Sequence, residues 1–173
     1  IQTVKDNRIS HAQLLLGPAG SGNLALALAY AQYIFCSNKQ ETDSCGECSS
    51  CLKMQKIAHP DFHFIFPVFK IKDGRETLSD DLIAQLRETL IPNPYLELDD
   101  FLENVGIQNK QPSIYVGESA AILRKLSFKA YEGEYRIVLI WKPEKMNTQA
   151  ANKMLKIIEE PPERTVFLLV AEN

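Results

Sequence analysis

LLLGPAGSGNLALALAY, residues 14–30, decides the fold of this chain. A short apolar run ends in a glycine-rich turn, and strong helix formers then continue to residue 35. A strand, a loop and a helix in this order are the setting of a phosphate-binding loop. The template Gly-x4-Gly-Lys-Ser/Thr aligns its two glycines with Gly17 and Gly22.

Two side chains of that template are missing. Asn23 and Leu24 stand where the lysine that neutralises phosphates and the hydroxyl that binds Mg²⁺ would be. The apolar run 137–140 should end in acidic residues, but Trp141 and Lys142 follow it. Because two separated elements depart together, we expect a nucleotide-binding fold without ATP hydrolysis and with no catalytic residues.

The loop itself has three interpretations. We expect a degenerate and empty phosphate loop, formed by Gly17, Gly20, Gly22 and Asn23, and therefore no ATP as cofactor. Backbone N–H groups at a helix start can still hold a phosphate without side chains, so residual nucleotide binding stays an alternative. The other alternative is a tight turn in an unrelated α/β protein.

All four cysteines of the chain fall in one short segment with the spacing C-x8-C-x2-C-x2-C. They are Cys36, Cys45, Cys48 and Cys51. Four thiolates with this spacing are typical of a closed, tetrahedral Zn²⁺ site, which is structural because no position is left for water. Free or disulfide-bonded thiols are the alternative, and the three histidines, His11, His59 and His63, are candidate substitute ligands.

Apolar runs alternate with helical patterns along the chain and predict an α/β fold, a parallel sheet flanked by helices with ligands at the carboxyl ends of the strands. The expected strands are 12–16, 62–69, 135–141 and 165–170, and the expected helices include 118–133, ending at Gly133, and the segment after Asn147, which caps it. The residues expected to face inward are Ile122, Leu123, Leu126 and Ala130 in the first of these helices and Ala151, Met154, Leu155 and Ile158 in the second. Residues 70–113 are predicted to be a mostly helical, acidic insertion, with Ser79 as cap of a helix over 79–90.

Composition narrows the class of protein. The 173 residues carry 19 basic and 22 acidic side chains, and a net charge of −3 argues against a surface that attracts nucleic acid by bulk charge. No apolar run is long enough to cross a bilayer, and the first residues lack the apolar core of a secretion signal. We therefore expect a cytoplasmic protein with no membrane partner.

Five stretches carry a resemblance to bacterial DNA polymerase III clamp-loader subunits of the delta-prime and gamma/tau group, within the AAA+ superfamily. They are RISHAQLLLGPAGSG (8–22), CGECSSC (45–51), HPD (59–61), YEGEYRIVLI (131–140) and NKMLKIIEEPPERTVFLL (152–169). The resemblance implies that 1–173 is a partial AAA+ nucleotide-binding-like domain, without the lid and C-terminal collar domains. It would include a zinc knuckle at 36–51 and the insertion at 70–113, and we expect the chain to be an N-terminal fragment.

Gamma and tau subunits keep the lysine, the hydroxyl and the acidic pair, so the departures at residues 23, 24, 141 and 142 resemble the non-hydrolysing delta-prime branch. The resemblance implies gamma/tau and delta subunits as partners, the sliding clamp and primer-template DNA as indirect partners, and sliding-clamp loading in DNA replication as the function. The resemblance implies that, in that branch, a Ser-Arg-Cys stretch after the last strand contributes an arginine finger to the ATP of the neighbouring subunit. The chain has no such stretch.

Two other functions stay open at this point. One is an ATP-hydrolysing gamma/tau-type subunit with a divergent phosphate loop. The other is a zinc-dependent nucleic-acid-binding module, which the acidic net charge disfavours. Basic residues such as Arg124, Lys125 and Lys129 are candidates for phosphate contacts, although such side chains on an exposed helix face are usually solvated.

Overall fold

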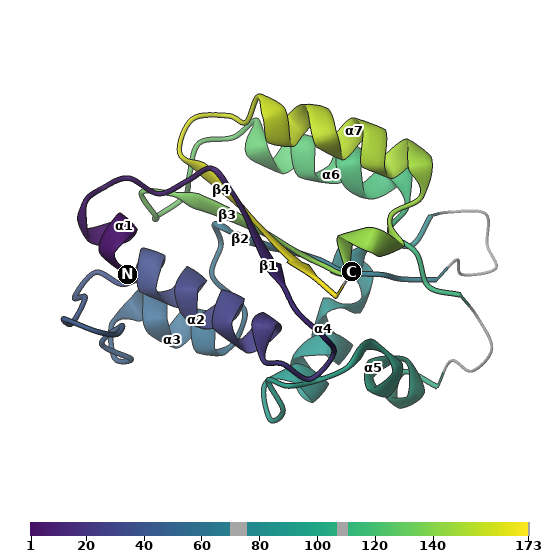
Figure 1. Cartoon of the computed structure of the whole chain (residues 1–173), viewed down its shortest axis with the longest axis horizontal. Helices are drawn as coiled ribbons and strands as arrows, with labels where there is room; N and C mark the ends of the chain where they lie inside the picture. The colour runs from purple at the N-terminus through teal and green to yellow at the C-terminus, as the bar shows by residue number, and fades with distance from the viewer. Residues whose placement is uncertain (70–75, 107–110, 173) are drawn as a thin grey trace.

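A computed structural model describes residues 1–69, 76–106 and 111–172. Within these residues four parallel strands form one sheet, in the order β1-β4-β3-β2, and helices lie on both of its faces (Figure 1). The strands are β1 (Ala12–Leu16), β2 (Phe62–Ile65), β3 (Arg136–Trp141) and β4 (Thr165–Ala171). The predicted α/β fold with a parallel sheet flanked by helices is confirmed.

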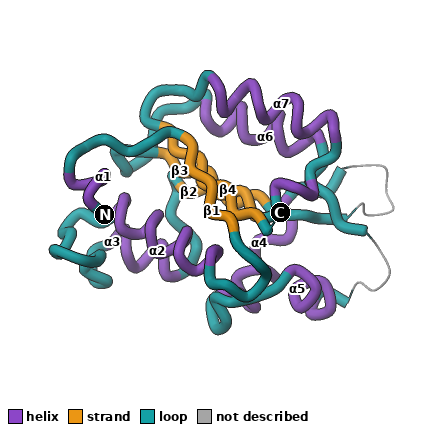
Figure 2. The backbone as a smooth tube through the Cα atoms, viewed as in Figure 1, coloured by secondary structure: helices purple, strands orange, loops and turns teal. Residues whose placement is uncertain are grey.

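The helices divide into two layers. Figure 2 shows α6 (Val116–Leu126) and α7 (Thr148–Glu159) side by side on one face of the strands. The other face is covered chiefly by α2 (Asn23–Phe35), α3 (Ser49–Gln55) and α4 (Ser79–Leu90). The remaining elements are α1 (Gln2–Lys5), α5 (Leu98–Asn104) and the 3₁₀ turn η1 (Pro143–Lys145).

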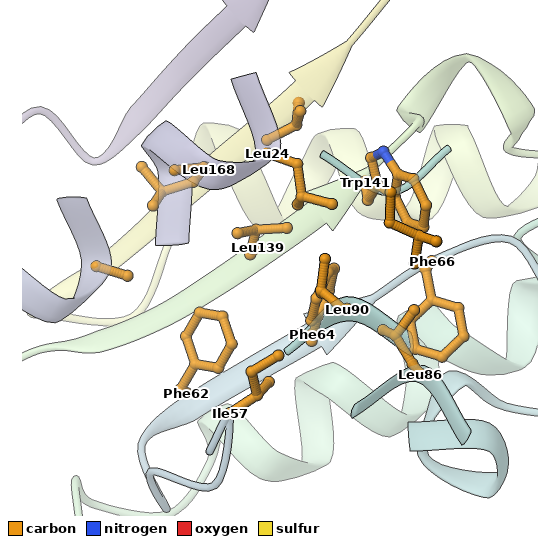
Figure 3. Close-up of a cluster of buried hydrophobic side chains, with 14 of the residues drawn as sticks. Leu24, Ile57, Phe62, Phe64, Phe66, Leu86, Leu90, Leu139, Trp141 and Leu168 are labelled. Atoms are coloured by element: carbon orange, nitrogen blue, oxygen red, sulfur yellow. The ribbon is translucent and has the colours of Figure 1, made fainter. Parts of the chain in front are cut away.

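Strand β3 is the centre of the core, because all six of its residues are buried. Such a strand reads as a continuous apolar run, since both faces of a parallel sheet are covered by helices. The larger apolar cluster lies on the α2 and α4 face, where Figure 3 shows Leu24 and Trp141 among the buried side chains. A smaller cluster, which includes Ile122, Met154 and Phe167, lies under α6 and α7.

The parallel arrangement gathers three segments at one edge of the sheet. β1 runs directly into the glycine-rich loop, and the Gly17 N–H donates to the Ala171 carbonyl at the end of β4 (3.2 Å). Trp141 ends β3 and pairs in register with Val170. The loop, the end of β3 and the end of β4 therefore meet, as expected for ligand sites in such sheets.

Two helices lie in the described part of segment 70–113, namely α4 and α5, while residues 70–75 and 107–110 of that expected insertion lie outside the described residues. The expected cap at Ser79 is wrong, because Ser79 is the first residue of α4 and Leu78 precedes it as N-cap. Ser79 is buried, and its hydroxyl bonds both the N–H and the carbonyl of Phe66 (3.0 Å each). The hydroxyl therefore satisfies the backbone beyond β2.

The expected helix 118–133 is also too long, since α6 ends at Leu126. The buried guanidinium of Arg136 donates to the carbonyls of Leu126 and Phe128 (2.6 Å each), so it satisfies groups that a continuing helix would use. The inward positions of Leu123 and Leu155 are wrong as well, because these side chains are 52% and 54% exposed.

Three of the expected inward residues, Ile122, Leu126 and Met154, are buried as predicted. The buried apolar residues of these two helices follow helical spacing. In α6 they are Ile122 and Leu126, and in α7 they are Ala150, Met154 and Ile157, at helical spacing. The predicted cap of α7 is confirmed, because the Asn147 side chain accepts from the Ala150 N–H (2.8 Å). No helix in the described ranges has the length and apolar character that a membrane crossing requires.

Asp61 fixes the loop between α6 and β3. Its buried carboxylate accepts the backbone N–H groups of Tyr131, Glu132 and Gly133 at 2.6, 2.9 and 2.7 Å. Burial opposes the charged form, but these three N–H donors outweigh it and lower the pKa of Asp61. Segments 70 residues apart are thus held by one carboxylate.

We predict that Asp61→Asn lowers the free energy of unfolding by about 2 kcal/mol or more, because charge-assisted hydrogen bonds are lost and the new amide donors face N–H groups. Urea denaturation measures this, with Asp99→Asn, a change of an exposed carboxylate in α5, as the matched control. The folded pKa of Asp61 lies below its ordinary value of 3.8. Its contribution is therefore present above pH 3.8 and is lost as pH falls through the folded pKa. Equal acid sensitivity of the parent and the Asn variant would contradict this role.

Candidate phosphate loop and cysteine cluster

The glycine-rich loop is shaped by two glycines and by the start of α2. Gly20 and Gly22 have φ angles of 72° and 83°, in the left-handed region that favours glycine. Gly22 is the N-cap of α2, and its carbonyl accepts the Leu26 N–H (2.9 Å). Ser21 closes a turn onto the Pro18 carbonyl (3.1 Å). The structure therefore brings Gly17, Gly20, Gly22 and Asn23 together at the start of a helix.

Asn23 turns its amide into the loop rather than outward. A Cβ atom on Gly17 would lie only 2.6 Å from Asn23 Nδ2, so a larger residue there would displace the Asn23 side chain. The Nδ2 atom is buried and has no hydrogen-bond partner within the described ranges. A neutral amide in this place offers no positive charge to a phosphate.

Leu24 and Trp141 are core residues. They are 6% and 3% exposed and belong to the larger apolar cluster (Figure 3). Neither has an oxygen atom that could hold Mg²⁺, which prefers oxygen ligands.

Lys142 makes an ion pair at the same edge of the sheet. Its Nζ lies 2.5 Å from Glu172 Oε1, just beyond β4, and the lysine is only 8% exposed. The Glu172 carboxylate is therefore in contact with an ammonium group, and a metal ion would have to displace that ammonium to reach it.

The cavity at the loop is small. Its volume is about 30 Å³, which matches the share of liquid volume of a single water molecule, whereas ligand pockets usually measure roughly 300 Å³ or more. Its walls are the loop 17–24, the ends of β3 and β4, and residues 94–97 from the segment between α4 and α5. In this conformation the loop has no room for a nucleotide.

Residues 94–97 were not predicted to be part of this site. The Asn-Pro pair at 93 and 94 predicts a turn, but the neighbouring residues do not indicate that this turn contacts a loop about 70 residues earlier in the chain. A long-range contact of this kind is visible only in the folded chain.

The four cysteines form one cluster. Cys36 follows α2, Cys51 lies in α3, and Cys45 and Cys48 lie on the connection between them. All four Sγ atoms are within 4.8 Å of one another, and the separations Cys36–Cys45 and Cys45–Cys51 are 3.6 and 4.0 Å. A tetrahedral site with Zn–S bonds of about 2.3 Å places its sulfurs about 3.8 Å apart. The donor set and spacing fit such a metal.

Backbone N–H groups point at these sulfurs. Cys45 donates to Cys36 Sγ and Cys48 donates to Cys45 Sγ, both at 3.3 Å, and Gly46 supplies a φ of 74° for the tight turn between them. Although burial opposes it, N–H donation by Cys51 and Ser37 lowers the pKa of Cys48 to about 5. Burial raises the pKa of Cys51 to about 12. The cluster thus favours negative charge on some sulfurs even before a cation binds.

The histidines are not part of this cluster. Among the described residues, the group that could hold a metal ion consists of the four cysteines alone. The His59 ring stacks on Phe35 at 3.9 Å, and burial lowers its pKa against the opposing charges of Glu132 and Asp61. Burial also lowers the pKa of His63, with help from Lys125, to about 4.

A parallel α/β sheet with a glycine-rich loop at its carboxyl edge and an attached four-cysteine cluster defines a protein of the nucleotide-binding α/β class. The family described as DNA polymerase III, delta subunit matches residues 1–173, and the chain belongs to this family.

Curated relatives agree with this assignment. The DNA polymerase III subunit delta' of Yersinia pestis is 30% identical over 92% of the chain and 35% of its own length, and that of Pseudomonas aeruginosa is 29% identical over 95% and 38%. DNA polymerase III subunit tau/gamma of Haemophilus influenzae is 23% identical over 98% of the chain and 18% of its own length. The chain thus spans between about a third and two fifths of its delta' relatives.

The contact between Tyr95 and Gly22 yields a test within one loop. A Cβ on Gly22 would meet Tyr95 Cε1 at 3.0 Å, whereas a Cβ on Gly20 would meet only Glu97 Oε1, at 3.5 Å. Both glycines have positive φ, so alanine carries a similar backbone strain of about 1 kcal/mol at either position. We predict that Gly22→Ala destabilises more than Gly20→Ala in urea denaturation, and that adding Tyr95→Ala removes the difference. A difference that persists without the tyrosine ring would contradict the contact.

Proposed function

We propose that the chain is a delta-prime-like, non-hydrolysing subunit of the DNA polymerase III clamp loader, which acts in loading the sliding clamp during DNA replication. Its residues 1–173 would be the AAA+ nucleotide-binding-like domain of a longer polypeptide, with lid and collar domains outside this range. The observation that carries the proposal is a glycine-rich loop at a helix start whose Asn23 is neutral, with a buried Nδ2 atom, and whose Leu24 is part of the core. Membership of the family and the delta' relatives support it.

The chemistry of hydrolysis supports the same proposal. Transfer of a γ-phosphoryl group relies on positioning and on positive charge around the phosphates, supplied by lysine and Mg²⁺. At this edge the loop has an amide and a leucine, the β3 end has an indole, and Lys142 is paired with Glu172. The role of the chain in the clamp loader would therefore lie in contacts with gamma/tau and delta subunits in the cytoplasm. Through these subunits it would act on the sliding clamp and primer-template DNA.

Calorimetric titration of the chain with ATP, with and without Mg²⁺, tests the silent site. We expect no saturable heat in either condition, because both the charge and the metal ligand are missing. Saturable, Mg²⁺-dependent binding would instead favour the alternative, an ATP-hydrolysing gamma/tau-type subunit with a divergent loop. A second measurement is co-purification of the full polypeptide with gamma/tau and delta subunits, and failure under conditions where those subunits assemble would contradict the assembly role.

We also propose that Cys36, Cys45, Cys48 and Cys51 hold a structural Zn²⁺. The four donors and their mutual spacing support zinc, and the ion would add a rigid cross-link between the end of α2 and the start of α3. With four thiolates the coordination sphere is complete, so the site would support no zinc chemistry.

We predict about one zinc per chain by elemental analysis, and loss of thermal stability when a chelator removes it, because metal affinity contributes directly to folding. Cys48→Ser should lower both the zinc content and the melting temperature. Ser49→Ala is the matched control, since Ser49 is an exposed neighbour outside the ligand set. Metal-free protein of unchanged stability would overturn the zinc site.

A further inference from the structure

Residues 94–97 are held in a turn with little freedom. The Tyr95 N–H donates to the Asn93 side-chain oxygen at 3.2 Å, and the Leu96 N–H donates to the Asn93 carbonyl at 3.1 Å. Pro94 occupies the second position of this turn, where its fixed φ angle suits the backbone. The turn therefore presents Tyr95 in a defined direction.

The same segment is anchored in the core by a residue after Tyr95 and by a residue after Glu97. Leu96 and Leu98 are 6% and 3% exposed and belong to the larger apolar cluster. Helix α5 begins at Leu98, and its Phe101 packs edge-on against Phe66 with ring centroids 5.6 Å apart. Packing against the core therefore fixes the position of the turn relative to the sheet.

Tyr95 and Glu97 lie over the two glycines that shape the phosphate loop. The Tyr95 ring edge comes within 3.0 Å of a Cβ position on Gly22, the residue at which α2 begins. Glu97 Oε1 lies 3.5 Å from the corresponding position on Gly20. Together with Trp141 and Glu172 these side chains reduce the cavity to about 30 Å³.

We propose that residues 94–97 are an intramolecular plug of the phosphate loop, which excludes phosphate groups by occupying their approach and by presenting the Glu97 carboxylate to them. This inference deepens the proposed silent site and rests on that proposal. It adds a second obstacle that does not depend on Asn23 or Leu24. Because a carboxylate repels phosphate and the ring covers Gly22, restoring positive charge at position 23 leaves the loop closed.

Tyr95 can be altered without opening the core, because its side chain is 61% exposed and contacts the loop with one edge. Trp141 reports on the plug, since it is the only tryptophan of the chain, is 3% exposed and lines the same cavity. We expect Tyr95→Ala to increase acrylamide quenching of Trp141 fluorescence and to shift its emission to the red, while Tyr95→Phe keeps the ring and leaves both unchanged.

Tyr131→Ala is the matched control for this measurement. Tyr131 is an 83% exposed tyrosine that precedes β3, whereas Trp141 ends that strand, so the same change is made at the opposite edge of the sheet. We expect the control to leave Trp141 quenching unaltered. Quenching that is the same in Tyr95→Ala, Tyr131→Ala and the parent chain would overturn the plug.

Nucleotide binding gives an independent readout, with Mg²⁺-ATP as the calorimetric probe. Asn23→Lys restores the cation, removes a side chain that makes no hydrogen bond through Nδ2, and keeps Leu24 in the core. We expect the Asn23→Lys variant to bind Mg²⁺-ATP at least roughly tenfold more tightly once Tyr95→Ala is added, a change of 1.4 kcal/mol. A double variant that binds no more tightly than Asn23→Lys overturns the plug and leaves the proposed function standing. Binding by the unaltered chain is the separate result that overturns the proposed function.

Discussion

The parallel pairing of β1, β4 and β3 is the constraint on which the rest of the structure depends. Because the three strands run in one direction, the loop after β1 lies beside the residues that end β3 and β4. Both faces of such a sheet must be covered, which requires the helices on each side and makes β3 apolar from Ile137 to Trp141. The identity of a few side chains at this edge then decides whether the fold handles a nucleotide.

A phosphate loop without a ligand presents a particular physical problem. Its glycines and helix-start N–H groups are arranged around an anion, and an open loop of this kind loses packing as well as hydrogen bonds. Here the Asn23 side chain lies against the loop at Gly17, and the Tyr95 side chain lies against it at Gly22. Gly20 and Gly22, which both have positive φ angles, lack a Cβ atom and so leave room for the side chains of Glu97 and Tyr95.

The sequence was sufficient where the signal is local. The strand-loop-helix order, the cap at Asn147 and the cysteine spacing each depend on residues close together in the chain, and the structure brings those residues together as expected. The sequence was insufficient for features that depend on contacts between segments far apart in the chain. Arg136 ends α6 through carbonyls eight and ten residues earlier, Ser79 bonds Phe66 instead of capping, and helix packing turns Leu123 outward. Tyr95 on Gly22 belongs to this second group, since no periodicity signals it.

Helix α2 joins the two parts of the site. It begins at Gly22 in the loop and ends next to Cys36, and 13 residues at about 1.5 Å each make it a rigid rod of roughly 20 Å. Its far end is held by the Phe35–His59 stack, and the Lys53–Glu132 ion pair (2.6 Å) ties α3 to the loop that Asp61 organises. A cross-link among the cysteines would complete this anchoring. Helix α2 thus connects the glycine-rich loop at one end with the cysteine cluster at the other.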